Sequence, residues 1–168
     1  MTIHKGQIFS MDFMIAMLVF LFMLAVTLSY SGEISNRIAL IEKDSARFTY
    51  AQHTANAVMF SSGYPADWEN LSDLTTVTSF GLAENRNIIS PAKVQRMADL
   101  NQSFYAGIKD LLGLSKYDLK IEIIKLDTGV KLKEFGTNPG SEDIVTSINR
   151  FGDYNGVTVN VRVKVFEQ

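Results

Sequence analysis

Few residues in this chain have the types and spacing that catalysis or metal binding requires. The 168-residue sequence contains no cysteine, which excludes disulfides, thiolate metal ligands and cysteine nucleophiles. The two histidines, His4 and His53, lie far apart and have no partner at the spacing of metal ligands. No glycine-rich phosphate loop, nucleophile elbow or HExxH pair occurs. We therefore expect no enzyme activity, no catalytic residue, no cofactor and no metal site.

The charge of the chain limits its partners as well. The formal net charge is -2 and no long block of lysine or arginine occurs, so we expect no binding to nucleic acid. Acidic neighbours such as Glu42 and Asp44 are local and do not form a convergent pair that the sequence can identify. We assign the acidic residues other than Asp12 to solvated faces.

Asp12 is the acidic residue whose position needs an explanation. It directly precedes an apolar run, residues 13–30, that contains no charge, proline or glycine. A carboxylate deep in hydrocarbon costs about 2.5–3.5 kcal/mol, so such groups tend to be paired or functional. Asp12 therefore either pairs with a cation of a neighbouring molecule or lies at the interface as a helix cap facing water. The residue types leave both interpretations open.

The apolar run is long enough to span a membrane. A hydrocarbon core of about 30 Å needs about 20 helical residues, and Ile8, Phe9 and Met11 extend the run at its amino-terminal end. A buried core helix that is apolar on every face would need a larger domain around it. A secretory signal peptide has a shorter apolar region, about 7–15 residues, followed by a cleavage site. We therefore expect a retained membrane-spanning segment.

The helix is expected to continue well beyond the membrane. No proline occurs between Gln7 and Phe60, and only Gly32 interrupts the pattern, so residues 7–60 are predicted to form one helix. An apolar stripe at helical spacing should pack on a partner surface; it comprises Ile34, Ile38, Ile41, Ser45, Phe48, Ala55 and Met59. Lys5 and His4 precede the run, which favours a cytoplasmic amino terminus and an extracellular carboxy-terminal domain.

Lys5, Gly6 and Gln7, followed by an acidic residue and a long apolar helix, resemble the class III signal peptide of archaeal type IV pilins and pilin-like proteins. The resemblance implies cleavage between Gly6 and Gln7, which removes residues 1–6 as a leader and retains the apolar run. It also implies a new ammonium at Gln7 that pairs with Asp12 of a neighbouring subunit. The acidic residue lies one place later than is common in that family.

The remainder, residues 61–168, is expected to form an extracellular α+β domain. An ordered loop should pack through Tyr64, Trp68, Leu71, Leu74, Phe80 and Leu82. Ser90 and Pro91 begin an amphipathic helix that ends at Leu112, before Gly113. Alternation predicts an antiparallel sheet of about four strands, covered on one face by helices; the strands are residues 118–126, 130–135, 143–151 and 157–166. Turns are expected at residues 127–129 and 155–156.

Two kinds of surface site are also predicted. Asn70 and Asn101 begin tripeptides of the N-glycosylation type. Five cations could form a basic binding strip on the exposed sheet face, or could equally be a solvated face that discourages edge pairing; they are Lys131, Lys133, Arg150, Arg162 and Lys164.

Two functions are compatible with these features. The resemblance implies a major or minor structural subunit of a type IV pilus-like surface filament, assembled through the amino-terminal helix. Its partners would be membrane lipid before assembly, other pilin subunits, a prepilin peptidase and the pilus assembly machinery. The alternative is a permanently membrane-tethered, single-pass protein whose extracellular domain binds a ligand or surface.

Overall fold

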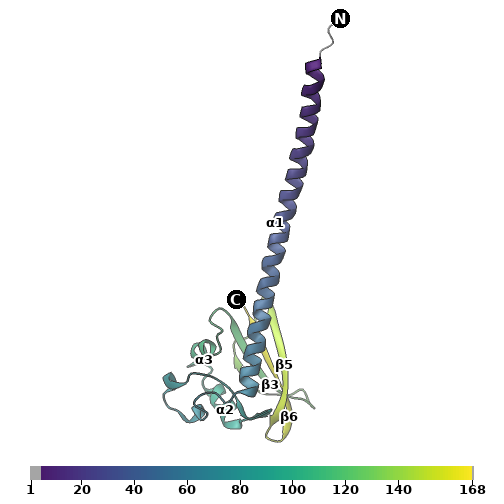
Figure 1. Ribbon diagram of the computed structural model, residues 1–168. Coiled ribbons are helices and arrows are strands. Elements are labelled where there is room, and N and C mark those ends of the chain that lie inside the picture. Colours follow the sequence, from purple (N-terminus) through teal and green to yellow (C-terminus); the bar gives the residue numbers. More distant parts are fainter. Residues whose placement is uncertain (1–4, 168) are drawn as a thin grey trace. The chain divides into compact units, whose positions relative to one another are not determined.

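The computed structural model describes residues 5–167, and side chains from residue 11 onward. His4 and most of the predicted leader lie outside this range. The chain forms two compact units, one that ends at Asp44 and one that begins at Ser45. Helix α1, Lys5–Phe60, is 56 residues long and contributes to both units (Figure 1). The protein is thus an α+β chain with a long, apolar amino-terminal helix that packs on a curled, mixed sheet.

From Met11 to the end of the first unit, α1 has no buried side chain. Every side chain from Met11 to Asp44 is exposed within the described structure. Polar residues within this stretch bond along the helix: Thr27 Oγ1 donates to the Met23 carbonyl at 2.8 Å, and Arg37 pairs with Glu33 at 2.7 Å. Exposed pairs of this kind contribute only about 0.3–0.5 kcal/mol each. An apolar surface of this length therefore needs a non-aqueous environment or another chain.

In the second unit, the last four turns of α1 form the centre of the core. Ala51, Ala55, Val58 and Met59 are fully buried and recur at steps of three and four, so they form one face of the helix. The predicted stripe is therefore divided: Ala55 and Met59 are buried, whereas Ile34, Ile38, Ile41 and Phe48 are exposed.

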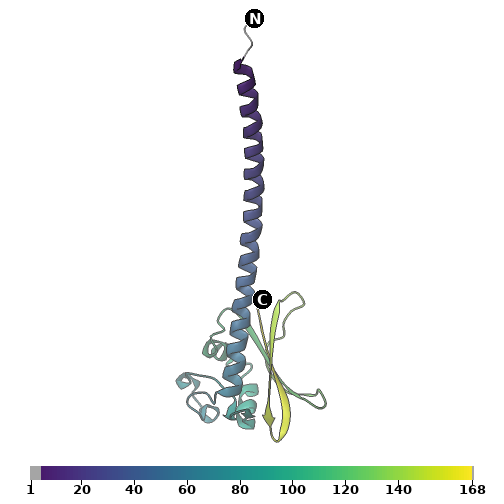
Figure 2. The same cartoon turned by 45° about the vertical axis from the view of Figure 1, so that its right-hand side comes forward.

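The sheet of the second unit has six strands in the order β1-β2-β5-β6-β3-β4. Figure 2 views it nearly edge on, with the helical segments on one side. The long strands are β3 (Asp118–Lys125), β4 (Lys131–Gly136), β5 (Val145–Tyr154) and β6 (Val157–Phe166). In β6, Val159, Val161, Val163 and Val165 are fully buried against the helices while the residues between them face outward. The alternation that predicts this strand reflects one dry and one wet face.

The prediction of about four antiparallel strands was incomplete. Two short strands, β1 (Ala83–Asn85) and β2 (Ile88–Ile89), extend the sheet beyond β5, and β2 pairs with β5 in the parallel direction. Two or three residues are too few for alternation to be recognised, so the sequence pattern favours a loop there. The four long strands are all antiparallel to their long neighbours, and the predicted turn at Asn155 and Gly156 is confirmed. Both turn residues have positive φ, 56° and 74°, as a two-residue hairpin requires.

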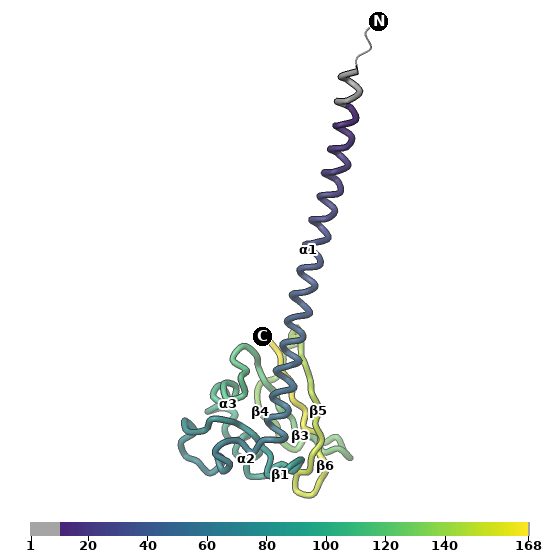
Figure 3. Tube along the Cα trace, in the orientation of Figure 1, coloured from purple at the N-terminus to yellow at the C-terminus, as the bar shows by residue number. Residues whose placement is uncertain are grey.

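The single helix predicted for residues 91–112 was wrong. The structure has two helices, α2 (Pro91–Asp99) and α3 (Tyr105–Leu111), which lie on the helical side of the unit with α1 (Figure 3). Asn101 lies in the break, and its Oδ1 accepts a 2.6 Å hydrogen bond from the backbone of Gly136. The apolar spacing continues across the break and conceals it. The predicted cap at Gly113 is present, with φ of 72°, but the Ser90 hydroxyl makes no capping hydrogen bond.

The loop before β1 is ordered around a buried tryptophan. It contains two short 3-10 helices, η1 (Trp68–Asn70) and η2 (Leu74–Thr76). Trp68 is 1% exposed, its Nε1 donates to the Gly81 carbonyl at 3.0 Å, and its ring centroid lies 4.8 Å from that of Phe80. Phe80 and Leu82 are buried as predicted, and Leu71 and Leu74 are partly buried. Tyr64 is 68% exposed, so its predicted packing role was wrong.

Substitution of two glycines separates steric overlap from backbone strain. Gly136 has φ of 95°, and a Cβ atom there would lie 1.9 Å from the Leu119 carbonyl oxygen; Gly113 has φ of 72° and open space around it. We expect Gly113→Ala to lower the free energy of unfolding by about 1–2 kcal/mol. Gly136→Ala should lower it by about 3 kcal/mol or more, because strain and overlap combine.

The measurement is urea unfolding of the full chain in detergent, followed by tryptophan fluorescence. Trp68 is the only tryptophan and is buried in the second unit, so its emission reports unfolding of that unit. Equal losses for the two variants would contradict the tight approach of Gly136 to β3.

Candidate membrane-spanning and assembly segment

The strongest candidate for a functional region is the amino-terminal part of α1. Among the described residues, one helix is long and apolar enough to cross a membrane, with a mean hydropathy of 2.4 over its most apolar 18 residues. None of that window is buried within the protein. Phe13, Phe20 and Phe22 are between 64% and 71% exposed, far above the few per cent typical of core residues. The segment is therefore compatible with a transmembrane helix, and it is not the core helix of either unit.

Asp12 lies at the start of this apolar surface. Its side chain is exposed, and among residues 11–167 the structure records no hydrogen bond or ion pair to it. The amino-terminal end of a helix is a favourable place for a carboxylate because the peptide dipoles present positive charge there. Gly6 and Gln7, the predicted cleavage residues, lie on the backbone of α1, and their side chains are outside the described part. Asp12 is thus a charged group at the edge of a surface that is otherwise apolar.

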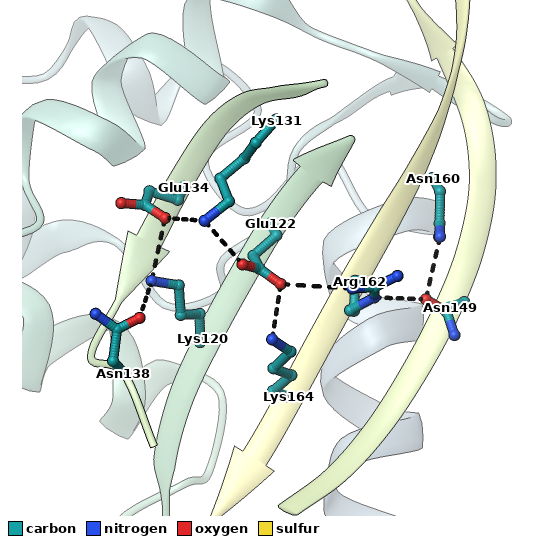
Figure 4. A network of polar contacts seen from close by, with 9 residues as sticks. All are labelled: Lys120, Glu122, Lys131, Glu134, Asn138, Asn149, Asn160, Arg162 and Lys164. Carbon is teal, nitrogen blue, oxygen red and sulfur yellow. Dashed lines mark hydrogen bonds and ion pairs between the residues drawn. The ribbon is translucent and has the colours of Figure 1, made fainter. Parts of the chain in front are cut away.

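The outer face of the sheet carries a charge network that the strand patterns alone do not indicate. Figure 4 shows Glu122 of β3 surrounded by cations from the two neighbouring strands. Glu122 is 6% exposed; Lys131 lies 3.0 Å from its Oε1, and Lys164 and Arg162 lie 2.9 and 4.0 Å from its Oε2. A second carboxylate, Glu134, contacts Lys120 at 3.1 Å and Lys131 at 2.7 Å.

These contacts divide the predicted basic strip between the two faces of the sheet. Lys131, Arg162 and Lys164 converge on Glu122, which offsets part of their charge. Arg150 lies on the opposite face, where its guanidinium donates to Asn56 of α1, and Lys133 donates to Gln95 of α2. Strand register explains the division, because Arg150 is opposite Val161 and Lys133 is opposite Ile123, both buried. The positions of these cations in the sequence do not show on which face of the sheet each side chain lies.

The network also determines the ionisation of its carboxylates. Burial alone would raise the pKa of Glu122, but hydrogen bonds and charge from Lys164 and Lys131 outweigh burial and hold that pKa below its ordinary value. The pKa of Glu134 is lowered mainly by its hydrogen bonds with Lys131 and Lys120. Both carboxylates therefore remain charged at neutral pH, and the outer face is a structural network of ion pairs.

Glu122→Gln should destabilise the second unit in a pH-dependent way. Removal of the charge leaves Lys131, Lys164 and Arg162 without their shared partner, and we expect a loss of about 2 kcal/mol at pH 7. Because the pKa of Glu122 is lower in the folded state, its contribution is complete above the ordinary carboxyl pKa of about 4.3 and is lost as pH falls through the folded value.

The difference between wild type and Glu122→Gln, measured by urea unfolding, should therefore shrink between pH 7 and pH 3. Glu142→Gln changes an exposed glutamate and serves as the matched control. A constant difference across that pH range would show that Glu122 acts through packing instead of charge.

A buried lysine is a further residue that sequence patterns missed. Lys93 of α2 is 4% exposed, and its Nζ donates to the Ser62 carbonyl at 2.7 Å and lies 3.4 Å from the Ala83 carbonyl. Burial lowers the pKa of Lys93, while Glu69, Glu84 and Asp67 act in the opposite direction. The ammonium thus links α2 to the backbone just after the end of α1 and to strand β1. On a helix, a lone lysine gives no signal of burial, so the sequence could not reveal this role.

The two predicted glycosylation sites differ in accessibility. Asn70 is exposed at the end of η1. Asn101 is partly buried, and its side-chain oxygen accepts from the Gly136 backbone. Transfer of a glycan requires a free carboxamide on the surface, which Asn70 offers and Asn101 does not.

Mass spectrometry of the native protein should therefore find any glycan on Asn70 and none on Asn101. Asn70→Gln should remove the added mass, whereas Asn101→Gln should leave it unchanged. Glycan on Asn101 would mean that the modification precedes folding of the Gly136 contact.

The remaining described residues contain no converging metal site. No group of three or more His, Cys, Asp or Glu side chains between residues 11 and 167 is arranged to hold a metal ion. His53 lies exposed on α1. Comparison with protein families, with curated proteins and with solved structures gives no match to this chain. The function therefore has to be inferred from the geometry of α1 and the composition of its amino-terminal end.

Proposed function

We propose that this chain is a structural subunit of a cell-surface filament of the type IV pilus kind. The leader, residues 1–6, is removed by a peptidase, and the apolar part of α1 passes from the membrane into the core of the filament. The folded second unit lies outside the cell. The chain performs no catalysis in this function, and its partners are other subunits and the machinery that extracts them from the membrane.

The observation that carries the proposal is the difference between the two parts of α1. Its last four turns bury Ala51, Ala55, Val58 and Met59 in a folded core, whereas the apolar stretch from Met11 to Tyr30 is wholly exposed. A tether needs only the length of a bilayer. In this chain the helix continues without a break from an unburied apolar stretch into a folded core. The apolar stretch can therefore contact lipid first and the helices of neighbouring subunits later.

The physical driving force for assembly depends on the lipid from which the apolar stretch moves into the filament. Lipid tails are as apolar as the side chains, so helices associate there through close packing and polar pairing instead of the hydrophobic effect. Asp12 is a charged group at the edge of the apolar stretch and is available for polar pairing. A contact between different surfaces of identical subunits does not close on itself and propagates as a helical filament.

The proposed pairing fixes the offset between neighbouring subunits. Gln7 and Asp12 are five positions apart, a rise of about 7.5 Å along a helix. The ammonium created at Gln7 therefore reaches a neighbour's Asp12 when the two helices are displaced by about that distance along their axes. A displaced, repeating contact of this kind is what a filament requires.

Asp12→Asn tests this function in the native host. The amide keeps the size of the side chain and removes its charge, so membrane insertion should be unchanged, while the yield of filaments should fall by about tenfold or more. Carbonate extraction measures insertion, and electron microscopy of sheared surface material measures filaments. Asp110→Asn, on the exposed surface of α3, is the matched control.

Amino-terminal sequencing of the wild-type protein completes the experiment. A mature chain that begins at Gln7 agrees with the filament function. An intact Met1 in membrane fractions, with no filaments, would instead favour a permanently tethered binding protein. Normal filaments from Asp12→Asn would reject the pairing while leaving the filament function in place.

A further inference from the structure

A narrow apolar seam continues along α1 past the end of the membrane-spanning stretch. Ile34, Ile38 and Ile41 are 52%, 51% and 67% exposed and follow one another at steps of four and three. This spacing places them in the a and d positions of a heptad, with Ile38 at a and Ile34 and Ile41 at d. The three isoleucines therefore form one edge of the helix in the first unit.

In the proposed function the seam lies in water, whereas the apolar stretch that precedes it lies in lipid. At about 1.5 Å per residue, Ile34 and Ile41 lie about 6 and 16 Å beyond Tyr30, on the side of the membrane where the second unit begins. Glu33, Arg37 and Glu42 are interspersed with them, which is the composition of a helix in water. The hydrophobic effect drives association of apolar side chains here, although it does not do so in lipid.

The charges beside the seam indicate which partner covers it. In this assignment, Arg37 occupies position g of one heptad and Glu42 occupies position e of the next. In a parallel pair of helices without axial offset, g of one chain faces e of the next heptad of the other, so each Arg37 meets a Glu42. The seam is thus complementary in charge to a second copy of itself. Arg37 pairs with Glu33 of its own helix at 2.7 Å, but both side chains are more than half exposed and free to exchange partners.

We propose that residues 31–44 form a parallel, in-register contact with the same segment of a second copy while both copies reside in the membrane. The inference rests on the membrane insertion of α1 that the proposed function includes, because insertion in one direction holds two copies parallel and raises their local concentration. The filament contact cannot produce this in-register arrangement, because Asp12 pairing requires an offset of about 7.5 Å between neighbours.

The two arrangements exclude each other for the same pair of chains. With no offset, Arg37 lies opposite Glu42 of the partner; with an offset of about five residues, that pairing is lost. The in-register contact is therefore a form of the subunit before assembly, and the filament contact replaces it.

Disulfide cross-linking tests the seam directly. The chain has no cysteine, so each single-cysteine variant reports one position. Ile34→Cys, Ile38→Cys and Ile41→Cys in the full chain, inserted in membranes, should form disulfide-linked dimers on mild oxidation. Leu40→Cys is the matched control because Leu40 is 61% exposed and apolar but points away from the seam. We expect at least about tenfold less dimer from Leu40→Cys than from Ile41→Cys.

Charge reversal tests the register. In the Ile38→Cys background, Arg37→Glu or Glu42→Arg alone should reduce cross-linking severalfold, and the two together should restore it. Carbonate extraction and tryptophan emission confirm that each variant is inserted and folded. Equal dimer from Leu40→Cys and Ile41→Cys, or no restoration by the double reversal, would overturn the proposal.

The experiment distinguishes this contact from the filament function. Cross-linking at the seam in cells that produce no filaments would refute the filament function alone. Filaments from a protein that never cross-links at the seam would refute the seam alone.

Discussion

The organisation of this protein depends on a long apolar surface that the protein does not bury. In a globular chain, exposed apolar area is removed by packing against other elements, and the second unit does this with α1, the sheet and the loop around Trp68. From Met11 to Tyr30 no such packing exists. Water is a poor solvent for that surface, which is compatible with a position in lipid or against other helices.

The stability of the second unit is internal. Its core is closed by small residues of α1, by the valines of β6 and by aromatic contacts around Trp68. Its outer sheet face is linked by ion pairs around Glu122, and the buried ammonium of Lys93 donates to backbone carbonyls. None of these contacts uses the apolar stretch from Met11 to Tyr30.

The sequence predicts the parts of the fold in which one periodicity extends over many residues. The long helix, the four long strands and the turn at Asn155 and Gly156 follow from spacing and turn chemistry, and they agree with the structure. The short strands β1 and β2 and the break between α2 and α3 do not follow, because each depends on a partner far away in sequence. Asn101, for example, lies in the break between α2 and α3 and accepts from Gly136 of β4, and no local pattern contains that information. Glu122 and Lys93 were missed for the same reason, since burial of a charge is decided by residues from other elements.

The absence of a break in α1 between residues 45 and 60 has a mechanical consequence. Tension that enters the second unit along the helix reaches the contacts of Ala51, Ala55, Val58 and Met59 together, because all four lie on one rigid rod. Separation of the rod from the sheet then requires sliding of the whole interface, which resists force better than peeling one contact at a time. A pull along α1 would therefore leave the second unit folded up to a higher force than a pull that opened the contacts in sequence.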